Sequence, residues 1–183
     1  MRVQTLTTPH GDSIGEVRKT LAMLGAFAMF LSTIDFMIPK PIPTMRIGLA
    51  NLPLMLALDM FPFRIFLVLV ALKVAGQALV TGTLFSPIFL FSLAGTTLAA
   101  SSMYGLRRLC GTKRISFVGL GTLGAMVSNS VQLVMASLWL MGGSARFIAP
   151  FYFAAGLISG VTLGAFCEAF TRRSRWYAER RIR

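Results

Sequence analysis

The chain has 183 residues, of which 55% are hydrophobic and only 13% are charged, and its mean hydropathy is +0.72. Soluble globular domains carry about 25% charged residues, so this composition excludes an ordinary water-soluble domain. The net charge of +12 comes from Lys and Arg that gather at the ends of apolar stretches, which indicates membrane topology and no nucleic-acid partner.

Six apolar stretches follow one another along the chain and predict an all-α integral membrane protein, a six-transmembrane-helix bundle. They cover residues 20–38, 47–60, 65–84, 88–106, 115–141 and 147–170. We expect a polar cytoplasmic N-terminus (1–19), a membrane domain (20–170) and a basic cytoplasmic tail (171–183). With both termini inside, the outer side carries only Lys40, Arg46 and Arg146, so the charges favour an N-in/C-in orientation. Trp176 and Tyr177 in the tail are typical of interfacial anchors.

The second stretch is the shortest. Its 14 residues would form a helix about 21 Å long, less than the roughly 30 Å of the hydrocarbon core. A re-entrant segment is therefore one alternative. It would place nearly as large an excess of Lys and Arg on the inner side of the membrane as six crossings do. Six crossings are preferred because the apolar sequence resumes at Phe61 and Phe63 and can extend past Arg64, whose long side chain can reach the head groups.

An irregular Pro/Gly segment leads into this second helix. Residues 39–43 contain three prolines. Gly48 then permits unusual backbone angles, Asn51 can cap a helix N-terminus, and Pro53 suits the first helical turn. A helix N-terminus close to Arg46 would favour an anionic or carbonyl-bearing ligand group. The alternative is an ordinary capped helix with Arg46 at the head groups.

Polar side chains near the middle of two helices predict a polar pocket. Lys73 and Gln77 share one face of the third helix, and Asn129 and Gln132 share one face of the fifth. Such groups are costly in lipid, so we expect them to face the bundle interior. The alternatives are a structural pair of Asp35 with Lys73 or with Arg46, and hydrogen bonds between helices. The candidate substrate-binding residues are Arg46, Asn51, Lys73, Gln77, Asn129 and Gln132. Cys110 and Cys167 are expected to be free thiols, and no catalytic residue, metal or cofactor is predicted.

Three ordered blocks carry a resemblance to a known bacterial family. They are residues 41–51, residues 81–87 with 91–95, and residues 124–125 with Asn129 and Gln132. Over residues 20–170 the chain resembles heptaprenyl diphosphate synthase component I, also called the Gx transporter family, which is similar to the S components of energy-coupling factor transporters. Two positions depart from the family pattern: Thr44 replaces a usual Gly, and Ser128 replaces a His, which puts a proton-linked role at that position in doubt.

The resemblance implies an S-component-like multi-pass protein of the bacterial cytoplasmic (inner) membrane, surrounded by lipids. It implies a transporter, or a substrate-binding membrane subunit, that captures a small vitamin-like or isoprenoid/quinone-related solute. Energy would then come from a separate membrane subunit with ATPases, since the chain has no Walker A motif.

The alternative function is a non-catalytic membrane accessory of polyprenyl diphosphate or quinone synthesis, bound to a soluble prenyl synthase. The six acids form no DDxxD motif that could hold magnesium against a diphosphate, so the chain is not expected to be an enzyme. A channel is less favoured because no selectivity filter is recognisable.

Overall fold

A computed structural model of the chain describes residues 14–38, 48–84, 86–111, 114–142 and 145–180, and all regular secondary structure in this part is helical. A short 3-10 turn, η1, precedes the second α-helix, and a π turn, η2, extends the fifth. The elements in chain order are α1 (Ile14–Met37), η1 (Leu49–Asn51), α2 (Leu52–Ala57), α3 (Phe63–Thr81), α4 (Pro87–Cys110), α5 (Phe117–Ala136), η2 (Ser137–Met141), α6 (Ala145–Arg173) and α7 (Arg175–Arg180).

Five of these helices, α1, α3, α4, α5 and α6, are long and apolar enough to cross a membrane. Large apolar side chains point outward from them; Phe30 and Phe36 on α1, for example, are 60% and 58% exposed. A soluble protein would not expose so much apolar surface, whereas lipid accommodates it. The prediction of a multi-pass helical membrane protein is therefore confirmed at this level.

The helix ends follow from local sequence. Gly82 ends α3 in the left-handed conformation (φ 67°), and its N–H bonds back to the carbonyls of Ala78 and Leu79. Pro87 then occupies the first turn of α4, where its missing N–H costs nothing. Ser116 caps α5 by accepting a hydrogen bond from the N–H of Gly119 at 3.2 Å.

The second apolar stretch does not form a helix that extends past Arg64. Its α-helical part, α2, has six residues, about 9 Å of length, and the chain turns through 58–62 before α3 begins at Phe63. Every residue of α2 is buried, as are Leu58 and Phe61 in the turn. The short helix contacts α1, α3, α5 and α6, so it lies within protein, where irregular backbone is tolerated at membrane depth.

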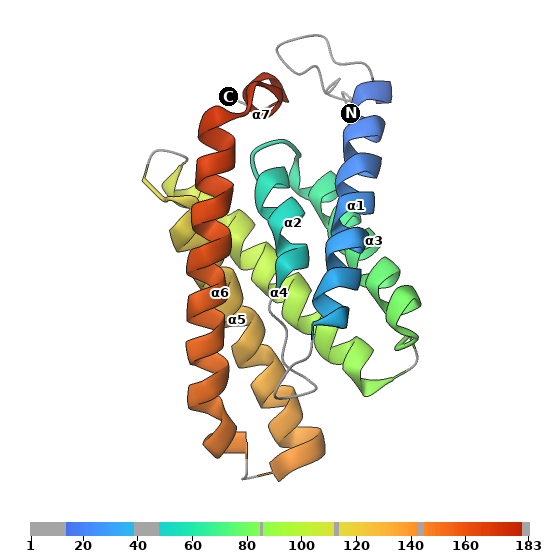
Figure 1. Cartoon of the computed structure of the whole chain (residues 1–183), viewed down its shortest axis with the longest axis vertical. Coiled ribbons are helices and arrows are strands. Elements are labelled where there is room, and N and C mark those ends of the chain that lie inside the picture. The colour runs from blue at the N-terminus through green and yellow to red at the C-terminus, as the bar shows by residue number, and fades with distance from the viewer. Residues whose placement is uncertain (1–13, 39–47, 85, 112–113, 143–144, 181–183) are drawn as a thin grey trace, which may run out of the picture.

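The helices form two groups joined by an oblique helix (Figure 1). Helices α5 and α6 run side by side, α1 packs on α3, and α4 crosses between the groups with contacts to α3 and α5. Helix α1 begins, and α6 ends, at the same end of the molecule, where α7 also lies. The two ends of the membrane domain thus share one side, while the number of crossings and the cytoplasmic face stay predictions.

Glycines bring α5 and α6 into backbone contact. A Cβ built on Gly121 would lie 2.5 Å from the carbonyl oxygen of Gly160, and one built on Gly160 would lie 2.8 Å from the carbonyl oxygen of Gly121. Any side chain at either position would therefore push the helices apart.

A buried ion pair closes the end of the bundle that holds α7. The guanidinium of Arg107 donates two hydrogen bonds to the carboxylate of Asp59 (2.9 and 2.6 Å) and a third to the carbonyl of Ile115 (2.6 Å). The hydroxyl of Tyr177 donates to the same carboxylate at 2.6 Å. The expectation that Tyr177 anchors the tail in the lipid interface is wrong, because this side chain is buried against Phe117 and Asp59.

Candidate functional site

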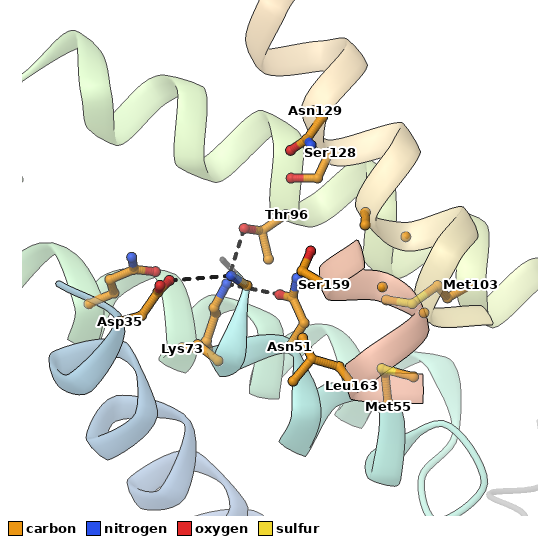
Figure 2. Close-up of a pocket in the computed structure, with 17 residues that line it drawn as sticks. Asp35, Asn51, Met55, Lys73, Thr96, Met103, Ser128, Asn129, Ser159 and Leu163 are labelled. Atoms are coloured by element: carbon orange, nitrogen blue, oxygen red, sulfur yellow. Dashed lines mark hydrogen bonds between the residues drawn. The ribbon is translucent and has the colours of Figure 1, made fainter. Parts of the chain in front are cut away.

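A polar cavity lies where the two helix groups meet, close to the start of α2 (Figure 2). The space inside it that is open to water molecules has a volume of about 30 Å³, which is enough for water but not for a drug-sized ligand. Its polar lining residues are Asp35, Asn51, Lys73, Gln77, Thr96, Ser128, Asn129 and Ser159. Its apolar lining includes Met55, Met103, Ala125 and Leu163.

Lys73 is the centre of the polar contacts. Its ammonium, on a side chain that is 4% exposed, donates hydrogen bonds to Oδ1 of Asn51 at 3.2 Å and to Oγ1 of Thr96 at 3.3 Å. Figure 2 shows the carboxylate of Asp35 directed at the same ammonium from α1. A buried charge is tolerated when an opposite charge and hydrogen bonds surround it, and Lys73 has both.

Asp35 also fixes the backbone that leads into α2. Its Oδ2 accepts a hydrogen bond from the N–H of Gly48 at 3.4 Å, and Gly48 has a left-handed φ of 84° that glycine adopts without strain. The expected cap at Asn51 is absent: this residue precedes α2 in helical conformation, and its side chain makes no cap hydrogen bond. Its amide oxygen binds Lys73 instead, while Pro53 stands in the first turn as predicted.

Asn129 is held in place by α6. Its Nδ2 donates to the backbone carbonyl of Tyr152 at 2.7 Å, and the side chain fits a space that exists only because residue 156 is Gly. This bond uses one of the two N–H groups of the amide, so its second N–H and its oxygen can both serve the cavity. Figure 2 shows the side-chain oxygens of Asn129 and Ser128 turned to the same side.

Gln77 contributes the one buried side-chain polar atom that lacks a hydrogen-bond partner among the described residues, its Oε1. The side chain is 7% exposed and lines the cavity. A buried polar atom without a partner costs about 1–3 kcal/mol, so such atoms are rare outside functional sites.

The structure thus brings four of the six predicted site residues around one cavity: Asn51, Lys73, Gln77 and Asn129. Gln132 does not line it; its Nε2 donates to Ser128 Oγ at 2.9 Å, and its side chain packs at Gly95 of α4. Asp35 faces Lys73, as the first of its two expected structural pairs requires. Arg46 lies outside the described residues.

Sequence reasoning missed Thr96, Ser159 and the two methionines as lining residues. Thr96 and Met103 are seven residues apart on α4 and therefore share a face, but the small residues around them indicate helix packing equally well. Ser159 is adjacent to Gly160, a glycine of the helix-packing pattern, so it too was interpreted as a small packing residue. The buried ion pair between Asp59 and Arg107 was also missed. An arginine at the cytoplasmic end of a predicted membrane helix is explained by the positive-inside rule alone, without a partner.

Comparison with known proteins identifies the family of the chain. The family model described as heptaprenyl diphosphate synthase component I matches residues 24–170, which include every residue that lines the cavity. No curated protein and no solved structure gives a significant match. This description names one component of a synthase, which implies that the synthase has at least one further subunit. The chain belongs to the heptaprenyl diphosphate synthase component I family.

Proposed function

We propose that this membrane protein captures a small vitamin-like or isoprenoid/quinone-related solute in the cavity around Lys73, as a transporter or as the substrate-binding subunit of one. The observation that carries the proposal is the Oε1 of Gln77, a buried acceptor without a partner among the described residues, in a cavity that already holds a buried ammonium. Structural polar groups are normally satisfied, so an unsatisfied one facing a cavity indicates a place for a ligand atom.

Capture requires the cavity to widen. In this conformation it admits molecules of the size of water, and its apolar side is formed partly by Met55 and Met103. Methionine side chains are unbranched and change rotamer at low cost, so they are suitable walls for a space that opens around a ligand. The described structure then represents the closed state.

Transport would need an energy source outside this chain, and we propose a coupling membrane subunit with cytoplasmic ATPases. The chain lacks the phosphate-binding motif of such ATPases. Its own task would be recognition alone, without catalysis.

The test is solute-induced thermal stabilisation of the purified chain, measured with a panel of vitamin-like and quinone-related compounds. A compound that stabilises the wild type should lose its effect in Asn129→Ala and in Thr96→Val, which alter the cavity. It should keep its effect in Arg108→Ala, whose side chain is exposed outside the cavity. Equal stabilisation of all four proteins would show that the solute binds elsewhere.

The second candidate is a non-catalytic accessory of prenyl diphosphate synthesis, and the family description favours it. Its contact with a soluble synthase would use exposed bases such as Arg108, Arg114 and Arg175. Arg107 is excluded from that surface because it is buried against Asp59. Co-purification with a prenyl synthase that is lost in Arg108→Ala/Arg114→Ala would support this candidate, whereas unchanged co-purification would remove the basic surface from it.

A further inference from the structure

A groove follows the last two turns of α6 on the outside of the bundle. It has a volume of about 370 Å³. Its lining residues are Phe166, Ala169, Phe170, Arg173 and Ser174. The groove is apolar at Phe166, which is 56% exposed, and at Phe170, which is 39% exposed, and it becomes polar at the end of the helix. None of these residues lines the cavity around Lys73, so the groove is a separate site.

Arg173 places a positive charge at the polar end of the groove. Its side chain makes no hydrogen bond or ion pair with a described residue, whereas the guanidinium of Arg172 binds the carboxylate of Glu168 at 2.7 Å. A guanidinium offers two parallel N–H donors, an arrangement that matches the oxygens of a phosphate. The hydroxyl of Ser174 accepts the N–H of Tyr177 at 3.2 Å and keeps its own proton to donate. The polar end of the groove therefore offers donors suited to a phosphate.

The sequence around the groove carries a net positive charge. Between Glu168 and Arg180 the chain has four arginines and two glutamates, all in the described part. Arg181 and Arg183 follow, and the only acid of the chain outside the described residues is Asp12. Each base near a membrane surface strengthens the attraction to anionic head groups. A lipid with a net negative charge is therefore favoured over phosphatidylcholine, whose phosphate is balanced by its own cation.

We propose that the groove binds an anionic phospholipid of the surrounding membrane, such as phosphatidylglycerol. The lipid phosphate lies against the guanidinium of Arg173 and the hydroxyl of Ser174, and one acyl chain lies along Phe166, Ala169 and Phe170. From Phe166 to Arg173 the helix rises about 10 Å, which is within the roughly 15 Å of hydrocarbon in one leaflet. The apolar and polar parts of the groove are therefore spaced as the acyl chain and the head group of one lipid are.

The test is native mass spectrometry of the full chain, purified in mild detergent and offered equal amounts of phosphatidylglycerol and phosphatidylcholine with the same acyl chains. We expect the phosphatidylglycerol complex to be at least about fivefold more abundant, because the excess of arginines favours the anionic head group. This comparison is made on the wild type and does not depend on how any variant folds. Farnesyl diphosphate is then added as a competitor and should not displace the lipid.

Neighbouring residues provide matched variants. Arg173→Gln should lower phosphatidylglycerol binding about fivefold, since it removes the cation that contacts the phosphate. Arg175→Gln removes the same charge from an exposed side chain that does not line the groove, so it should lower binding less than about twofold. Ala169→Phe fills the apolar part without changing a charge and should lower binding about fivefold. Ala154→Phe, at an exposed position of α6 outside the groove, should leave binding unchanged.

The proposal is overturned if the two lipids bind equally, if the two arginine variants lose phosphatidylglycerol alike, or if Ala169→Phe binds as much of it as the wild type. Farnesyl diphosphate that displaces phosphatidylglycerol from the wild type would also overturn it, because the occupant would then be an isoprenoid diphosphate. These outcomes do not depend on whether a solute binds around Lys73, so this proposal and solute capture fail separately.

Discussion

At the scale of the residue, Lys73 shows how a membrane-embedded charge is kept and used. Its ammonium bonds to Asn51 and Thr96 and faces Asp35, so three separate elements, η1, α4 and α1, meet at one atom. Lys73 and its partners therefore determine the position of the non-helical backbone at Gly48 as well as the polarity of the cavity.

Lys73→Met tests this arrangement. Removing one partner of a buried charge pair leaves the other charge uncompensated, so we expect a loss of about 3 kcal/mol in the free energy of unfolding. Asp35→Asn/Lys73→Met, in which no charge remains, should recover most of that loss. The measurement is SDS-induced unfolding of the purified chain, and a double variant as unstable as the single one would show that Asp35 is not the matching charge.

A second residue-scale prediction concerns Gly156. A methyl group at this position would occupy the space of the Asn129 amide, so Gly156→Ala should cost about 1–3 kcal/mol and remove the bond to Tyr152. Gly105→Ala is the matched control on α4, because a Cβ built there meets no heavy atom of the described chain within 4 Å. Equal thermal midpoints for the two variants would mean that Asn129 is not held as described.

At the scale of the element, the short helix α2 links the cavity to the closed end of the bundle. Asn51 precedes its first residue, and Asp59 follows its last residue by two positions. Asp59 in turn binds Arg107 of α4 and Tyr177 of α7. Both ends of α2 are thus fixed by charged groups from other helices.

Neighbouring arginines on α4 test this link. Arg107→Met should destabilise the chain by about 3–5 kcal/mol, because it leaves the buried Asp59 carboxylate without its cation. Arg108→Met changes an exposed side chain whose guanidinium bonds to the Tyr104 hydroxyl, so it should cost about 1 kcal/mol or less. If the two variants unfold alike, the pair with Asp59 does not contribute as its geometry indicates.

The predicted apolar stretches 65–84 and 88–106 correspond to α3 and α4, and the boundary between these helices is governed by local chemistry. Gly82 and Pro87 determine a helix end and a helix start through backbone constraints that need no tertiary contact. Asn51 and Tyr177 were misassigned because their partners, Lys73 and Asp59, are 22 and 118 residues away. The extent of α2 was overestimated for a related reason: apolar sequence is equally compatible with a spanning helix and with a short helix buried in protein.

At the scale of the whole molecule, the common end for the start of α1 and the end of α6 predicts that both termini lie on one side of the membrane. The excess of Lys and Arg at the ends of the sequence predicts that this side is the cytoplasmic one. Green fluorescent protein fused before Met1 and, separately, after Arg183 should therefore fluoresce in both fusions. Fluorescence of the C-terminal fusion alone would instead support a re-entrant second segment and five crossings.

The central claim is that the cavity around Lys73 holds a solute. The most direct measurement is mass spectrometry of small molecules that remain with the full chain after purification in mild detergent, comparing the wild type with Asn129→Ala. We expect one small molecule in near-stoichiometric amount on the wild type and its loss from the variant. The same small molecules in the same amounts on both proteins, or none on the wild type, would contradict it.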